Sequence, residues 1–207
     1  MKCICFGRGT GVLIKTNGKM MRVIQLSKEL TKKLFATLTI AGAVLAGSAG
    51  LAAAAEPSLL GKFNDWSAYT YGSGSSRICY VLSEPKEMQP RGAARGDVYL
   101  MVTHRPGQNV RNEISMRIGY PFSDRSRPFA QIGSDKFQMF SGVREGGENR
   151  FWAWLEDTSD EGRMASAMRR GSTLIIKGTS ERGTLTTDRY SLSGITAALN
   201  KIDDSCR

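Results

Sequence analysis

The sequence predicts one mainly-β domain with two short α-helices, preceded by an N-terminal leader. Between residues 66 and 139, apolar and polar residues alternate with a period of two, which is typical of half-buried strands. Glycine and proline mark turns between these runs. Two later segments carry apolar residues at helical spacing. We therefore expect a leader at residues 1–55 and a single β-domain at residues 56–207.

Three features of the leader predict Sec-type export. Lys28, Lys32 and Lys33 form a positive segment, and residues 34–51 are apolar and uncharged. The small residues that follow predict cleavage between Ala55 and Glu56. A retained anchor is the alternative, but glycines and alanines weaken the run as a membrane span. We expect no stable membrane span after cleavage.

The net charge of +10 belongs mostly to the leader. The leader holds eight bases and one acid, so residues 56–207 keep 21 of the 29 bases and 18 of the 19 acids, a net of +3. A domain this close to neutral lacks the strong basic excess of nucleic-acid-binding proteins, so we expect no nucleic acid partner. The start of translation stays open between Met1, Met20 and Met21.

Cleavage would remove Cys3 and Cys5 and leave Cys79 and Cys206. An even pair of cysteines in an oxidising compartment favours a structural disulfide. Two unpaired buried thiols are the alternative. A structural zinc site needs four Cys or His ligands, and His104 is the only histidine. We expect no metal and no cofactor.

The first strands are expected at residues 77–82 and 98–103, the second of them central because it is apolar on both faces. A turn at Arg105–Gly107 follows, with the glycine expected at positive φ. The next strand turns one apolar face to the core, made of Ile114, Met116, Ile118 and Tyr120. Further strands are expected at residues 136–140, 150–155, 172–177 and 184–192, the last two forming a hairpin.

Two helices interrupt the strands. A capping box at Thr158 and Glu161 predicts the start of the first helix, and Gly171 its end. The second helix begins near Ser193. Its apolar residues recur at helical spacing on one face. They are Ile195, Ala198, Leu199 and Ile202.

Three sequence features could carry chemistry. His104 is expected to be a surface residue beside a turn, with general acid or base catalysis as the alternative. Trp152 and Trp154 share one face of a strand, and we expect them in the core, with a sugar-binding platform as the alternative. Acids at a helix start are expected to cap it, with a Ca²⁺ site or paired catalytic carboxylates as alternatives. These acids are Glu156, Asp157, Asp160 and Glu161.

Arginines are concentrated in residues 91–127, which carry a local charge of +4, whereas residues 144–161 carry −4. Exposed charge of one sign attracts partners of the other sign. The arginines form a candidate site for an anionic partner, with dispersed solvated charges as the alternative. They are Arg91, Arg95, Arg105, Arg111, Arg117, Arg125 and Arg127.

Several runs resemble the invasion-associated locus B proteins of alphaproteobacteria, and together they cover nearly the whole domain. The runs are Ile78–Val81, Arg95–Tyr99, Val102–Gly107, Tyr120–Phe122, Ala153–Asp157, Met168–Ser172, Lys177–Ser180 and Thr186–Leu192. The resemblance implies an immunoglobulin-like antiparallel β-sandwich that is exported to the periplasm or outer envelope, or secreted. The family's name comes from a link to host-cell invasion. The resemblance supplies no catalytic residue.

Two functions remain open from the sequence. The first is a non-enzymatic envelope protein that binds an envelope or host macromolecule. The second is an envelope enzyme acting on polysaccharide through the carboxylates near Glu156, with Trp152 and Trp154 as its platform. A groove that joins the tryptophans to two carboxylates would favour the enzyme.

Overall fold

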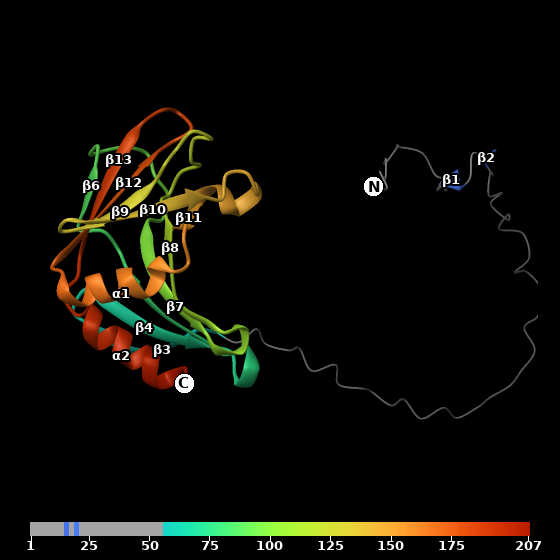
Figure 1. Ribbon diagram of the computed structural model, residues 1–207. Helices are drawn as coiled ribbons and strands as arrows, with labels where there is room; N and C mark the ends of the chain where they lie inside the picture. Colours follow the sequence, from blue (N-terminus) through green and yellow to red (C-terminus); the bar gives the residue numbers. More distant parts are fainter. Residues whose placement is uncertain (1–14, 17–18, 21–55) are drawn as a thin grey trace, which may run out of the picture. The chain divides into compact units, whose positions relative to one another are not determined.

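The computed structural model describes residues 15–16, 19–20 and 56–207 of the chain (Figure 1). The two-residue strands β1 (Lys15–Thr16) and β2 (Lys19–Met20) pair with each other. The apolar run of the predicted leader and Ala55 lie outside the described residues, so cleavage remains a prediction. In residues 56–207, the prediction of a mainly antiparallel β-fold with two short helices is confirmed.

Eleven antiparallel strands of the domain follow one another in the order β3-β4-β5-β7-β8-β11-β10-β9-β12-β13-β6. Their bounds are β3 (Ser58–Phe63), β4 (Trp66–Tyr71), β5 (Ile78–Ser83), β6 (Glu87–Gln89), β7 (Tyr99–Arg105), β8 (Val110–Arg117), β9 (Phe129–Ile132), β10 (Asp135–Ser141), β11 (Trp152–Leu155), β12 (Thr173–Thr179) and β13 (Leu185–Ser191). The sequence reasoning placed most of them and missed β3, β4, β6 and β9.

Strand β10 joins the two layers of the sandwich. Its first half, residues 135–138, pairs with β9, and its second half, residues 139–141, pairs with β11. The layer containing β9, β12, β13 and β6 therefore continues into the layer that runs from β11 to β3 (Figure 1). The predicted hairpin of β12 and β13 is present, and Gly183 takes a φ of 81° in its turn.

Two α-helices complete the core, α1 (Asp160–Arg170) and α2 (Ile195–Ser205). Helix α2 packs against β3, β4 and β5, and α1 packs against β8, β10 and α2 (Figure 1). The predicted apolar stripe of α2 is buried, as is the predicted inner face of β8 and the residues after it. Among the described residues, no helix is long and apolar enough to cross a membrane.

The predicted capping box is wrong. Ser159 is the N-cap of α1 and makes no side-chain capping bond. Instead, the Asp157 carboxylate accepts a bond from the Ser159 N–H at 2.8 Å, and the Glu161 N–H donates to the Thr158 carbonyl. The carboxylate of Glu161 is thus free for another role. Asp160 and Glu161 still lie in the first turn, where the helix dipole stabilises acids.

The turn after β7 also differs from its prediction. The positive φ of 55° belongs to Asn109, which ends the short 3-10 helix η2 (Pro106–Gln108). Gly107 is required for another reason, because a Cβ there would lie 2.0 Å from the Ser75 carbonyl oxygen. The other 3-10 helices are η1 (Gly74–Ser76) and η3 (Gly147–Phe151).

Candidate functional site

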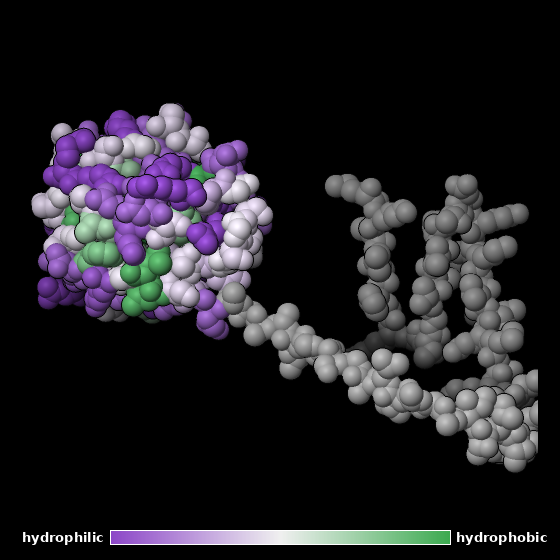
Figure 2. Space-filling view, turned by 90° about the horizontal axis from the view of Figure 1, so that it is seen from below, coloured by the Kyte–Doolittle hydropathy of each residue, from purple (hydrophilic) through white to green (hydrophobic). Residues whose placement is uncertain are grey.

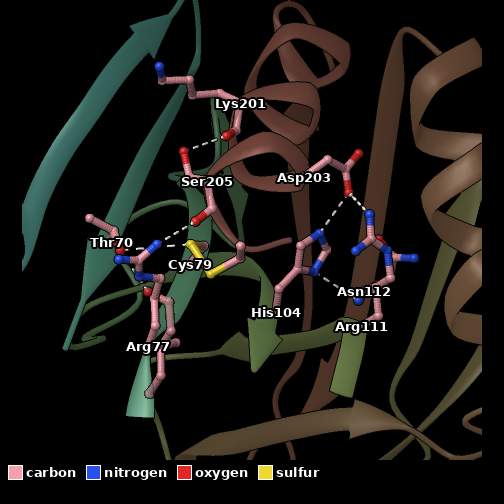
Figure 3. The surroundings of a disulfide bond; sticks show 11 residues. Thr70, Arg77, Cys79, His104, Arg111, Asn112, Lys201, Asp203 and Ser205 are labelled. Atoms are coloured by element: carbon pink, nitrogen blue, oxygen red, sulfur yellow. Dashed lines mark hydrogen bonds and ion pairs between the residues drawn. A yellow bond between two sulfur atoms is a disulfide. The ribbon is translucent and has the colours of Figure 1, made fainter. Parts of the chain in front are cut away.

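A disulfide joins Cys79 on β5 to Cys206 at the end of α2 (Figure 3). The bonded sulfurs are 2.08 Å apart, the Cα atoms 6.0 Å, and the residues are separated by 127 positions in the sequence. The predicted pairing is therefore present. It fastens the end of α2 to β5, the third strand in the order of the sheet.

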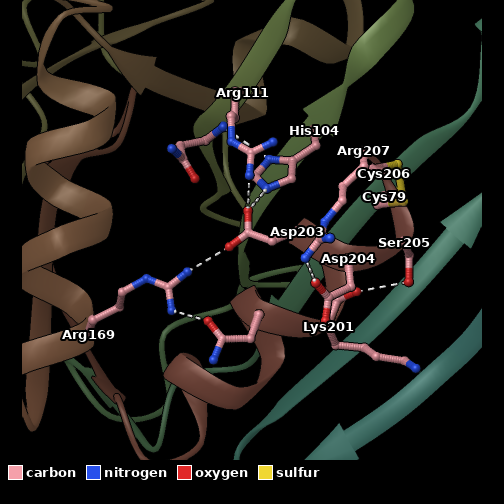
Figure 4. Close-up of polar contacts among 12 residues, drawn as sticks. Cys79, His104, Arg111, Arg169, Lys201, Asp203, Asp204, Ser205, Cys206 and Arg207 are labelled. Carbon is pink, nitrogen blue, oxygen red and sulfur yellow. Dashed lines mark hydrogen bonds and ion pairs between the residues drawn. A yellow bond between two sulfur atoms is a disulfide. The ribbon is translucent and has the colours of Figure 1, made fainter.

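Asp203 on α2 lies beside this disulfide and accepts bonds from three side chains (Figure 4). His104 Nε2 lies 3.0 Å and Arg111 Nη2 2.5 Å from its Oδ1, and Arg169 Nη2 lies 2.9 Å from its Oδ2. Since Arg169 belongs to α1 and His104 to β7, one carboxylate connects both helices to the sheet.

The expectation that His104 is a surface residue is wrong: it is 1% exposed. A shift in the β7–β8 register accompanies its burial. Its Nδ1 accepts the N–H of Asn112 at 3.1 Å, so Nε2 carries the proton of a neutral ring and donates it to Asp203. Both ring nitrogens are engaged within the protein. This arrangement gives His104 a structural role in holding α2.

The arginines of the predicted anionic-partner site do not form one free basic patch. Three of them make partly exposed ion pairs with acids of the domain: Arg105 with Glu113, Arg111 with Asp203, and Arg117 with Glu148. A fourth, Arg95, is buried. The remaining three are exposed. They are Arg91, Arg125 and Arg127.

Arg95 is removed from the candidate binding set because its side chain is only 4% exposed. Its guanidinium holds both carboxylate oxygens of Asp188 at 2.6 and 2.7 Å and also donates to the Ile118 carbonyl. Burial raises the pKa of Asp188, and the bonds from Arg95 oppose that rise. The pair joins the segment before β7 to β13 and lies inside the fold, out of reach of a macromolecule.

The expectation that the two β11 tryptophans fill the core is also wrong. Ala153 and Leu155 face the core, whereas Trp152 and Trp154 alternate with them and lie half-buried on the outer face of the sheet. The alternation in β11 was readable from the sequence. Both sets of side chains are apolar, however, so the pattern could not say which set faces inward.

Four aromatic rings form a continuous row on this outer face. The ring centroids of Trp152 and Tyr99 of β7 are 5.5 Å apart, and those of Trp152 and Trp154 are 6.2 Å apart. The ring of Trp154 in turn lies 5.7 Å from that of Phe140 of β10. We call these four side chains the aromatic face. Apolar side chains continue this face onto the neighbouring strands. Across the sheet from Trp154, beyond β8, the paired residues are Met101 of β7 and Leu82 of β5.

The domain carries hydrophobic patches on its surface. Seen from below, hydrophobic side chains gather into patches bordered by hydrophilic ones (Figure 2).

Phe140, at the end of the aromatic face, keeps 42% of its surface exposed. Helices α1 and α2 contribute their buried residues to the core on the opposite side of the sheet. In residues 56–207, neither helix therefore covers the aromatic face.

A hollow of about 380 Å³ opens at the end of the aromatic face, between Trp154 and Phe140. We call it the acidic hollow, because every charged residue in its lining is an acid. These are Glu113, Glu145 and Glu161. Burial raises the pKa of Glu161, and the neighbouring Glu113 raises it further, whereas Arg105 lowers it. Glu113 itself is paired with Arg105.

The sequence reasoning therefore found part of this site. It singled out Trp152, Trp154 and Glu161, but expected the tryptophans inside and assigned Glu161 to the helix cap. It missed Glu113 and Glu145, which come to Trp154 from β8 and from the loop after β10. Glu156 and Asp157 do not line the hollow.

Comparison with known proteins gives a structural match. The crystal structure of invasion-associated protein B from Bartonella henselae aligns with 70% of this chain and 96% of its own, at 13% identity and a TM-score of 0.49. No family model and no curated protein matches the chain.

Proposed function

We propose that this chain is an exported cell-envelope protein of the invasion-associated locus B type, which binds a macromolecule and catalyses no reaction. The aromatic face is the observation that carries the binding role. Trp, Tyr and Phe are enriched in interfaces, and Trp and Tyr are enriched among the few residues that supply most of the binding energy. The runs of sequence from Ile78 to Leu192 support the family.

Export is supported by the leader pattern and by the disulfide. Structural disulfides persist in the periplasm and outside the cell, and are rare in the reducing cytosol. The Cys79–Cys206 bond closes a loop that includes most of the domain. We place the working protein in the periplasm, in the outer envelope or outside the cell.

The experiment captures partners from an envelope extract with the purified domain 56–207, which contains the whole core described above. A Trp152→Ser, Trp154→Ser variant serves as the matched control, because both rings lie on the outer face. The proposal expects a macromolecule that the parent protein retains and the variant loses. Equal capture by both proteins would contradict binding through this face.

A second candidate function is an envelope enzyme that acts on polysaccharide, and the acidic hollow is the observation that favours it. Trp154 and Phe140 could stack on a sugar ring. Glu161, whose pKa is raised, suits a proton donor, and Glu113, which is paired with Arg105, suits a base or nucleophile. Release of reducing ends from envelope polysaccharide, abolished by Glu161→Gln, would establish this function and contradict a purely binding role.

A further inference from the structure

The aromatic face and the acidic hollow form one continuous surface, because Trp154 and Phe140 belong to both. The aromatic face supplies apolar area, and the hollow supplies negative charge at its end. A partner that covers both must therefore combine apolar contacts with a charged group at a defined position.

The charge of the hollow determines whether that group must be positive or negative. Three carboxylates line the hollow, and within residues 56–207 the only cation that these acids contact is Arg105, which is already paired with Glu113. A partner that covers the hollow removes water from these carboxylates. This removal is costly unless the partner brings a compensating positive charge. A neutral sugar or an anionic polymer offers none.

Aromatic rings reinforce the same choice. The face of an indole ring attracts an ammonium or guanidinium group, and the attraction is strongest where water is excluded. The domain already contains cation–π contacts of this kind, with Arg163 lying 4.2 Å above the ring of Phe137. In the part of the chain that the structure describes, the lining of the hollow places carboxylates beside Trp154 and Phe140 but contains no cation.

We propose that the aromatic face and the acidic hollow bind a basic polypeptide segment, with a lysine or arginine side chain seated against Trp154 among Glu113, Glu145 and Glu161. This inference deepens the proposed function and rests on it, since it names the chemistry of the macromolecule. Residues 56–207 carry a net charge of +3, so the domain as a whole repels such a segment and the attraction is local.

The test uses tetralysine with capped ends, added to the ¹⁵N-labelled domain 56–207. The three tryptophans give three indole N–H signals. Trp66 serves as an internal reference, because it is fully buried and its Nε1–H donates to the Ser191 carbonyl at 3.0 Å. We expect the Trp154 signal to move and the Trp66 signal to stay. Tetralysine acetylated on every side chain keeps the peptide and removes the charge, so it should bind at least about tenfold more weakly.

Two variants of equal charge locate the site. Glu145→Gln with Glu161→Gln removes two carboxylates from the hollow and should weaken tetralysine binding about tenfold. Glu84→Gln with Asp124→Asn removes two exposed acids elsewhere and should change it less than about twofold. An unchanged Trp66 signal confirms that each variant is folded.

Three results would overturn the inference: equal binding of the acetylated peptide, equal loss in both double variants, or a Trp154 signal that responds to a neutral oligosaccharide and not to tetralysine. The last result would favour the enzyme. None of them would decide whether the protein is exported or whether it captures an envelope partner.

Discussion

Cys79 lies directly across from His104 in the ladder between β5 and β7, and both residues hold the last turn of α2. Cys79 does so through its disulfide with Cys206, and His104 through its bond to Asp203. Figure 3 shows the two attachments side by side. Chain ends fray unless they are fastened.

Replacing Cys206 with serine should lower the melting temperature by several degrees. The disulfide spans 127 positions, and the loop-entropy relation gives about 5 kcal/mol for such a loop as an upper figure. Amide exchange should accelerate first in α2, between Ile195 and Ile202. Uniform acceleration through the whole domain, or none, would contradict a local role for this bond.

Replacing Asp203 with alanine should destabilise the domain by about 2 kcal/mol, because it removes the acceptor of a buried histidine and of two arginines. The neighbouring Asp204 provides the control. Its carboxylate pairs with Arg207 and is 63% exposed, so Asp204→Ala should cost less than about 0.5 kcal/mol. Urea unfolding measures both values, and equal losses would refute the special position of Asp203.

Replacing Arg95 with methionine should cost about 3–5 kcal/mol at neutral pH, because it leaves Asp188 buried without its partner. Burial would then raise the pKa of Asp188 without opposition, so the folded state would hold the proton more tightly than the unfolded chain. Stability of the variant should therefore increase as the pH falls and decrease as it rises.

Two comparisons test this account of Arg95. A further Asp188→Leu replacement in the variant should recover much of the loss, since no buried charge remains. Arg150→Met removes a pair with Glu181 in which both side chains are more than 40% exposed, and should have a small effect. A pH-independent loss in Arg95→Met would contradict the account.

Alkaline pH should weaken the fold through Tyr120. Burial raises the pKa of its hydroxyl to about 12. Between about pH 10 and 12 the unfolded chain loses this proton while the folded state keeps it, so the free energy of unfolding should fall by roughly 1.4 kcal/mol per pH unit from this group. Tyr120→Phe should flatten the fall in urea unfolding between pH 9 and 11, whereas Tyr71→Phe, at an exposed side chain, should not. An unchanged slope in Tyr120→Phe would contradict the assignment.

The sequence predicted those elements that have one apolar face. Residues 114–120 alternate cleanly, and α2 carries one apolar stripe, so burial could be assigned from spacing alone. Strand β6 has three exposed residues, and β9 four residues, so neither gives a periodic signal of useful length. Their pairing depends on β13 and β12, which lie far away in the sequence.

The candidate site was predictable only in part, because the burial of its residues depends on parts of the chain that are distant in the sequence. The β11 residues are apolar on both faces, and the direction of the tryptophans is decided by which face the rest of the sheet closes over. The burial of Arg95 and His104 depends on Asp188 and Asp203, about ninety and one hundred residues later in the chain. Local spacing carries no information about such partners.

Intact mass measurement of the protein isolated from the cell envelope tests the central claim most directly. The account predicts a chain that begins at Glu56 and is lighter by two hydrogen atoms than its reduced form, because Cys79 and Cys206 are bonded. Reduction should add these two hydrogen atoms to the measured mass. A mass that includes the apolar residues 34–51, or one that reduction leaves unchanged, would contradict export with a structural disulfide.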